Sequence, residues 1–148
     1  MPSSSSLAIA PVTDADIADV VALWQACGLT RPWNDPSADI ALARRGPSSA
    51  LLVGRSPEAI VATAMVGHDG HRGWVYYVAV DPSSQGKGFG RTMMAAVEDW
   101  LRAAGVPKLQ LLVRRENAKA GAFYQSLGYE ESTSVMLAKW LDGREATS

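Results

Sequence analysis

The chain contains one cysteine, Cys27, among its 148 residues. A single cysteine cannot close an internal disulfide, and it excludes the usual structural zinc sites, which need at least two thiolates. No basic residue lies close to Cys27 in the sequence to activate it as a nucleophile. These absences, together with the N-terminal sequence, predict a protein of the reducing cytoplasm.

Long apolar runs and an excess of positive charge are also missing. No run approaches the roughly 18 residues of a membrane span, and residues 1–6 have neither a basic region nor a long apolar core that would indicate a secretory signal. Lys and Arg number 14 against 15 Asp and Glu, which gives a net charge of -1. Without a basic surplus to neutralise phosphates, nucleic acid is not an expected partner, and neither is a membrane.

The residues that are present suit one soluble globular domain. Hydrophobic residues make up 47% of the chain and charged residues 20%, which are ordinary proportions, and this length supports one core. We expect the domain to span residues 7–141, with flexible ends at 1–6 and 142–148.

Hydrophobic periodicity and turn residues predict an alternation of strands and helices. The expected strands are residues 7–12, 50–54, 59–66, 74–80, 108–113 and one or two within 129–141. The expected helices begin at Thr13 or Asp14, at Asp35, after Gly90 and at Asn117, and they end near Cys27, Gly46, Gly105 and Leu127. The fold class is therefore α/β (α+β): a single mixed sheet of six or seven strands with helices on both faces.

A glycine-rich loop at residues 85–91 follows the most strand-like segment, 74–80, and opens the long third helix. Glycines allow the backbone to approach a ligand closely, and a helix N-terminus presents unpaired N–H groups with a partial positive charge. Lys87 and Arg91 add positive charge. Phosphate or pyrophosphate binding is the physical interpretation; a glycine-rich connection without a ligand is the alternative.

Two common phosphate motifs do not fit this loop. The P-loop pattern fails because Asp81 stands at its first glycine and Gly88 stands where its hydroxyl residue belongs. The dinucleotide fingerprint fails because Arg91 or Met93 takes the place of its last glycine. A nucleotide-phosphate enzyme is therefore disfavoured.

Three blocks, in order, resemble the GNAT superfamily of acetyl-CoA-dependent N-acyltransferases. The blocks are Tyr77-Val78-Ala79-Val80-Asp81-Pro82, then Gln85-x-x-Gly88-x-Gly90, then Asn117-x-x-Ala120-x-x-x-Tyr124 with Leu127-Gly128-Tyr129. The resemblance covers about residues 7–140. Segments 23–36 and 69–77 further resemble a bacterial YpeA-like subgroup.

The resemblance implies a mostly antiparallel sheet with a splayed central strand pair and a bulge around Val78 and Val80 that frees backbone groups for a ligand. It also implies about four helices, and acetyl-CoA as cofactor, with CoA as product. It implies that the pyrophosphate is held by the loop residues Gln85, Gly86, Lys87, Gly88, Phe89, Gly90 and Arg91, and the pantetheine arm by Val78, Ala79 and Val80. Asn117 would lie near the thiol, and Tyr124 would protonate the departing thiolate, because a phenol can serve as an acid for sulfur. Direct attack by a primary amine needs no metal.

The chain departs from the family pattern at the general base. Trp74 and Leu112 stand where many members carry a glutamate, and neither can accept a proton. His71 is the candidate base because its ordinary pKa suits neutral pH. Asp69, Glu116 and a water chain to solvent are the alternatives.

The acceptor side is expected near the loop between the first two helices. Trp33, Asn34 and Asp35 are the candidate substrate-binding residues there, with Asp39 as a further carboxylate, although Asp35 also fits a helix cap. Tyr76 is a candidate from the central strand, because alternation predicts that Tyr76 and Tyr77 point to opposite faces and only one can line this side.

The predicted function is an N-acetyltransferase acting on a peptide or protein amine or a small amine. A CoA-binding sensor or interaction domain without turnover is the alternative that the missing glutamates at Trp74 and Leu112 keep open. A homodimer is possible, since dimers are common in the family.

Overall fold

The computed structural model describes residues 6–145, and these divide into two units, one ending at Leu111 and the other beginning at Leu112. The first unit holds the sheet. Its strands are β1 (Ala8–Pro11), β2 (Ser49–Arg55), β3 (Ile60–His68), β4 (Gly73–Val80) and β5 (Leu109–Gln110). Its α-helices are α1 (Ile17–Ala26), α2 (Pro36–Ala43) and α3 (Phe89–Ala103), with short 3-10 turns η1 (Asp14–Asp16) and η2 (Pro82–Ser84).

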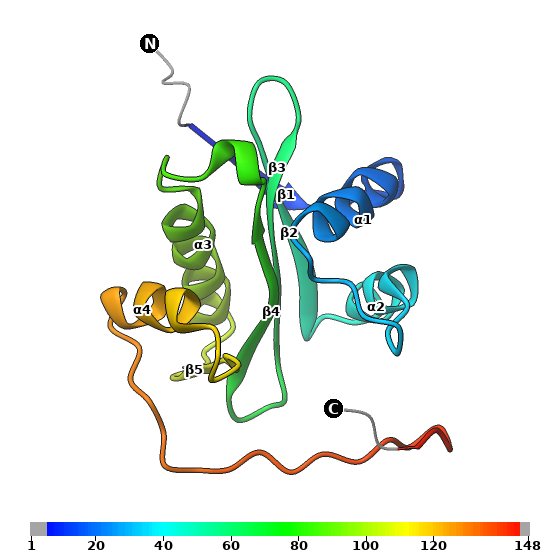
Figure 1. Ribbon diagram of the computed structural model, residues 1–148, viewed down its shortest axis with the longest axis vertical. Helices are drawn as coiled ribbons and strands as arrows, with labels where there is room; N and C mark the ends of the chain where they lie inside the picture. The colour runs from blue at the N-terminus through cyan, green and yellow to red at the C-terminus, as the bar shows by residue number, and fades with distance from the viewer. Residues whose placement is uncertain (1–5, 146–148) are drawn as a thin grey trace. The chain divides into compact units, whose positions relative to one another are not determined.

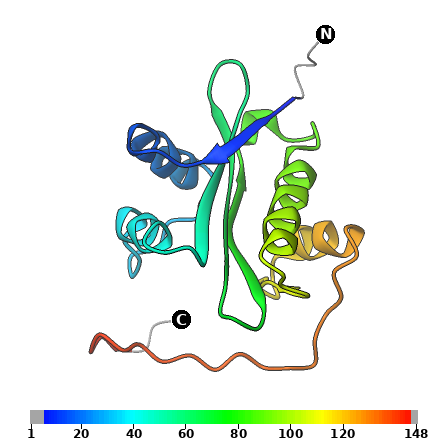
Figure 2. The same ribbon diagram turned by 180° about the vertical axis from the view of Figure 1, so that it is seen from behind.

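The sheet has the order β1-β2-β3-β4-β5, so every strand pairs with its neighbour in sequence. All pairs are antiparallel except β4 and β5, which are parallel. Helices α1 and α2 cover one face and α3 covers the other (Figures 1 and 2). Side chains of both layers are fully buried, among them Trp24 and Ile40 on the first face and Met93 and Val97 on α3. A mixed α/β fold with helices on both faces is confirmed.

Local signals in the sequence account for the helix ends. Asp35 Oδ1 accepts hydrogen bonds from the N–H groups of Ser37 (3.0 Å) and Ala38 (3.3 Å), and Pro36 takes the first helical position. Gly28, with φ +69°, follows the end of α1 in the left-handed conformation that glycine favours. The predicted cap of α2 and the predicted stop of α1 are therefore confirmed.

The second unit contains α4 (Ala118–Ser126). Asn117 caps it, because its side-chain oxygen accepts a hydrogen bond of 3.1 Å from the N–H of Ala120, as the sequence predicts. Gly128, with φ +96°, follows the helix.

The strand count predicted from the sequence is wrong. The sheet has five strands within residues 6–145, not six or seven, and the expected strands within 129–141 are not formed. The fifth strand covers Leu109–Gln110 rather than 108–113. Apolar and β-branched residues favour an extended chain, but a strand also requires a hydrogen-bonded neighbour, which periodicity cannot supply.

An ion pair between a buried carboxylate and an exposed arginine ties the start of the first helical segment to the sheet. Asp16, with a side chain 7% exposed, lies 2.5 Å from the Arg55 guanidinium at the end of β2, and it accepts the Thr13 N–H at 2.9 Å. The hydrogen bond from Arg55, followed by that from Thr13, holds the pKa of the Asp16 carboxyl below its usual range.

Asp16→Asn should lower the free energy of unfolding at neutral pH by about 1–2 kcal/mol, because it leaves Arg55 without its counter-charge. A carboxyl whose pKa is depressed by folding stabilises the protein above its unfolded pKa near 4, and that contribution is lost as pH falls through the lower folded value. Denaturant titrations from pH 7 to pH 3 measure both effects. Asp14→Asn is the control, since Asp14 pairs with Arg44 but is 92% exposed; equal losses in the two variants would contradict the role of burial.

Candidate active site

The glycine-rich loop runs between the end of β4 and the first residue of α3. Gly86 and Gly88 have φ of +84° and +79°, and Gly88 is the N-cap of α3. A residue with a side chain rarely adopts such backbone angles. The two glycines therefore let the chain turn from η2 into the helix, which begins at Phe89 with its ring buried.

The entrance to α3 is open. A Cβ built on Gly86 or Gly88 would meet no atom within 4 Å, and Gln85, Lys87 and Arg91 are exposed. The first N–H groups of the helix lack intrahelical acceptors, and Gly88 provides no side-chain cap. The structure thus brings the cationic side chains and the unpaired helix N–H groups of the predicted cofactor loop together in one accessible place.

Strand β4 carries a bulge before this loop. Its partners on β3 are Ala79 opposite Thr63 and Tyr76 opposite Met65, so two residues of β4, Tyr77 and Val78, face one residue of β3. Tyr77 has φ +52°, the one positive φ outside glycine among residues 6–145. Such a conformation costs on the order of 1–3 kcal/mol unless its surroundings enforce it.

A network of side chains enforces the bulge. The Tyr77 ring stacks on Trp24 with centroids 3.7 Å apart, and its hydroxyl donates to Asp39 Oδ2 at 2.7 Å. Trp24 Nε1 donates to Thr63 Oγ1 at 2.9 Å, and Thr63 Oγ1 donates to the Tyr77 carbonyl at 2.8 Å. Burial, and then the hydrogen bond to Asp39, raise the pKa of Tyr77, so its phenol stays protonated.

The bulge puts Tyr76 and Tyr77 on the same face of the sheet, so the alternation predicted from the sequence is wrong here. Tyr77 stacks on Trp24 of α1, and Tyr76 is paired with Met65, which packs against the core that contains Trp24. Directly paired residues point to one face. The extra residue in β4 therefore turns both rings toward the face of α1 and α2.

The hydrogen-bond pattern between β3 and β4 also leaves part of the β4 backbone facing away from β3. The Asp81 N–H donates to the Val61 carbonyl at 2.8 Å, so this residue bonds toward β3. Backbone groups alternate in direction along an antiparallel strand, so those of Val80 and Val78 face away from β3 while Ala79 faces it. Pairing with β5 is confined to Gly73 and Trp74, which leaves this edge of β4 without a β5 partner, as the expected splay requires.

The two carboxylates of the expected acceptor region have different hydrogen-bond partners. Asp35 Oδ1 serves as the cap of α2, whereas Asp39 on that helix is bonded to Tyr77 at the bulge. Trp33 and Asn34, both half-buried, lie in the loop that leads into α2. The sequence analysis favoured Tyr76 over Tyr77 for this side, and the bulge was implied by the family resemblance, since no periodicity signal indicates it.

The structure does not bring His71 to the bulge. It is exposed in the β3–β4 turn, and six positions along an extended chain place it up to roughly 20 Å from Tyr77. Asp69 lies in that turn as well, and hydrogen bonds from the N–H groups of Arg72 and His71 lower its pKa, which weakens it as a base. Trp74 also serves this turn, because its Nε1 donates to Asp69 at 3.4 Å.

Cys27 has the surroundings of a structural thiol. Its Sγ donates to the Val80 carbonyl at 3.3 Å, and burial raises its pKa, as does the nearby Asp81 carboxylate to a smaller extent. A thiol that ionises late is a poor nucleophile, which agrees with the expectation from the sequence.

The second unit holds the other predicted residues. Tyr124 lies on α4 with its ring edge-on to Phe123 and Tyr129, at centroid distances of 5.0 and 6.0 Å. Burial raises the pKa of the Tyr124 phenol. Asn117 uses its side-chain oxygen for the cap of α4, so its amide N–H groups are the part that can donate to a ligand. Glu116 precedes it and is exposed.

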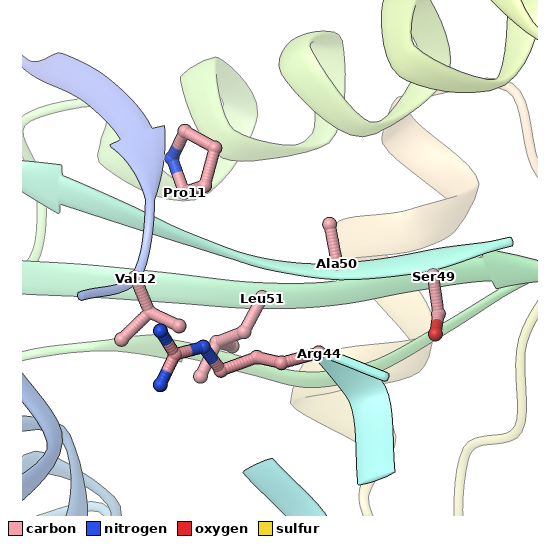
Figure 3. A pocket seen from close by; sticks show the side chains of 6 residues that line it. All are labelled: Pro11, Val12, Arg44, Ser49, Ala50 and Leu51. Carbon is pink, nitrogen blue, oxygen red and sulfur yellow. The ribbon is translucent and has the colours of Figure 1, made fainter. Parts of the chain in front are cut away.

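A cavity of about 190 Å³ lies where β1 meets β2, beside the end of α2. Its lining is Pro11, Val12, Arg44, Ser49, Ala50 and Leu51 (Figure 3). The Arg44 guanidinium that borders it is already paired with Asp14 at 2.7 Å. None of the predicted site residues lines this cavity, so it is separate from the site on β4 and α3.

Comparison with known proteins agrees with this geometry. The model of the acetyltransferase (GNAT) family matches residues 17–129. The chain belongs to the GNAT acetyltransferase family. An acetyltransferase of Yersinia enterocolitica is 40% identical over 127 residues, which are 86% of this chain and 90% of that protein. The more specific YpeA-like subgroup stays a prediction.

Solved GNAT structures share the fold. An aminoglycoside acetyltransferase, AAC(6')-Iy, solved with a CoA-containing bisubstrate analogue, superposes with a TM-score of 0.79 at 17% identity, covering 91% of this chain and 98% of that one. The ribosomal-protein-S18-alanine N-acetyltransferase of Escherichia coli has a TM-score of 0.73 at 26% identity, covering 86% and 80%. In the present chain, no helix described between residues 6 and 145 is long and apolar enough to cross a membrane.

The hydroxyl of Thr63 should be essential to the bulge. Thr63→Val keeps the side-chain shape but leaves the Trp24 N–H and the Tyr77 carbonyl without their buried partner, so the free energy of unfolding should fall by about 1–3 kcal/mol. Denaturant unfolding followed by tryptophan fluorescence measures the loss. Thr63→Ser retains the hydroxyl and is the matched control; a loss for Thr63→Ser with none for Thr63→Val would show that the methyl group, not the hydroxyl, holds the bulge.

Proposed function

We propose that this acetyltransferase moves the acetyl group of acetyl-CoA to the nitrogen of a primary amine by direct attack on the thioester carbonyl. The observation that carries the proposal is the open entrance to α3, where two positive-φ glycines expose helix N–H groups directly after a strand with outward-facing backbone. The acceptor is a peptide or protein amine or a small amine. The name of the Escherichia coli relative, an N-acetyltransferase, supports nitrogen as the acceptor atom.

The chain has suitable residues for two parts of acetyl-CoA, the pyrophosphate and the pantetheine arm. The backbone N–H groups from Gly86 to Arg91 bind the pyrophosphate, with charge from Lys87 and Arg91, because an anion at a helix N-terminus is stabilised by both the unpaired donors and the helix dipole. The outward-facing groups of Val78 and the N–H of Val80 bind the pantetheine amides like an added strand, while the Val80 carbonyl already accepts the Cys27 thiol. Ala79, the buried residue between Val78 and Val80, belongs to the same proposed pantetheine-binding segment.

The reaction requires one proton to reach the departing CoA sulfur and another to leave the attacking amine. Tyr124 donates its phenol proton to the departing CoA sulfur and regains a proton from solvent before the next turnover. Burial raises the pKa of this phenol, so it enters the reaction in the protonated form. Asn117 donates an amide N–H near the thiol. The proton lost by the amine passes to solvent through water, since Trp74 and Leu112 cannot accept it and His71 lies in the distant turn. A cytoplasmic location and a homodimer belong to the same proposal.

Gly88→Ala should weaken acetyl-CoA binding by 10-fold or more, because a Cβ at this position lies where the pyrophosphate approaches the backbone. Gly105→Ala is a matched control: Gly105 follows the other end of α3, has the same φ of +79° and equally open surroundings. Both variants should lose similar stability from backbone strain, and calorimetry should show reduced acetyl-CoA affinity for Gly88→Ala alone. Equal affinities would contradict the placement of the pyrophosphate.

Tyr124→Phe should lower kcat by about 100-fold while changing acetyl-CoA affinity little, since the hydroxyl acts as the thiolate leaves. Release of free CoA thiol with a panel of primary amines measures kcat, and calorimetry measures affinity. Tyr129→Phe is the control from the same aromatic cluster. An unchanged kcat would remove Tyr124 from the mechanism, and tight acetyl-CoA binding by the wild type without turnover of any amine would favour a sensor.

A further inference from the structure

We infer that Asp39 binds the ammonium group of the acceptor and that Tyr76 and Tyr77 provide aromatic surfaces beside it. The inference rests on the proposed function and names the substrate class of that site: a primary amine that is cationic when it binds. Asp39 then determines specificity, a role that Asp35, occupied as a helix cap, cannot share to the same extent.

The carboxylate of Asp39 is fixed in position but only partly used. Its Oδ2 accepts the Tyr77 hydroxyl at 2.7 Å. Its Oδ1 has no hydrogen-bond partner within the described residues 6–145. Since no unpartnered side-chain oxygen is buried among those residues, Oδ1 is exposed. Asp39 forms no ion pair with any described Lys or Arg, in contrast to Asp14 and Asp16, which each pair with an arginine. An oriented carboxylate oxygen is therefore accessible to a cation.

The order of features along β4 places this carboxylate toward the reacting end of the cofactor. The loop that binds pyrophosphate follows the strand, and the backbone groups for the pantetheine arm are at Val80 and Val78. An arm that extends from the loop along these residues reaches the bulge next. Tyr77 and Tyr76 follow in that direction, and both rings lie on the face where Tyr77 contacts Asp39.

The chemistry of these groups suits an ammonium ion. A carboxylate forms a charge-assisted hydrogen bond with it, and aromatic faces attract it through their quadrupole. Tyr76 is 49% exposed, so its ring is accessible to a ligand. An acceptor that carries a carboxylate next to its nitrogen would bring a second negative charge against Asp39, so free amino acids are disfavoured relative to alkylamines and peptide N-termini.

The test compares acceptors in the full-length wild type and Asp39→Asn. The variant keeps a side-chain oxygen for the Tyr77 hydroxyl, so the bulge is retained. The probes are n-butylamine, which is cationic at the assay pH, and methoxyamine, which is neutral. Removing the charge should raise KM for n-butylamine about 10–100-fold, change KM for methoxyamine less than about 3-fold, and leave acetyl-CoA affinity unchanged. Asp19→Asn, an exposed carboxylate on α1, is the control and should match the wild type.

A direct binding measurement separates this inference from the proposed function. Calorimetric titration of n-butylamine into wild type and Asp39→Asn in the presence of CoA needs no turnover. Binding that depends on Asp39 without acetyl transfer would refute the proposed function and support the inference. Equal KM values for n-butylamine, equal affinities in the titration, or no binding to the wild type would each overturn the role of Asp39.

Discussion

The conformation of Tyr77 is the constraint on which the site depends. An L-residue with φ +52° in the middle of a strand persists because three elements hold it: Trp24 of α1 stacks on its ring, Thr63 of β3 binds its carbonyl, and Asp39 of α2 accepts its hydroxyl. The contacts of Trp24 and Asp39 join the helical layer to the sheet, and that of Thr63 joins β3 to β4. The strain at one residue is thereby offset by contacts that also position the two helices on that face.

The bulge divides β4 into two parts with different tasks. Before it, Gly73 and Trp74 pair with β5 and complete the sheet. From Val78 in the bulge to Val80, outward-facing backbone groups lead toward the open entrance of α3. Binding a cofactor through main-chain groups requires only that side chains stay out of the way, which explains why the recognisable signature of this loop is its glycines and not a set of polar side chains.

The sequence was most informative where a residue type has a local mechanism. The caps at Asp35 and Asn117 and the stop at Gly28 follow from side-chain and backbone chemistry within a few residues, and each was predictable. The bulge follows only from the family resemblance and not from residue chemistry or periodicity, because one additional residue in a ladder changes the pairing without changing composition. It moves Tyr77 to the opposite face from the predicted one. The strands expected near Val135 failed for a related reason: an apolar extended segment does not specify its partner.

The absence of the family's glutamates at Trp74 and Leu112 is consistent with an ammonium-binding carboxylate elsewhere in the site. A carboxylate that binds the protonated amine also stabilises its charged form, and this opposes the loss of the proton that attack requires. Tyr77 moderates that effect, because its hydroxyl donates to Asp39 Oδ2 and already stabilises part of the carboxylate charge. An acceptor bound to the remaining oxygen is held less firmly as a cation than by an isolated carboxylate, so its proton passes more readily to water. A carboxylate moderated in this way can select a cationic amine without acting as the base that deprotonates it.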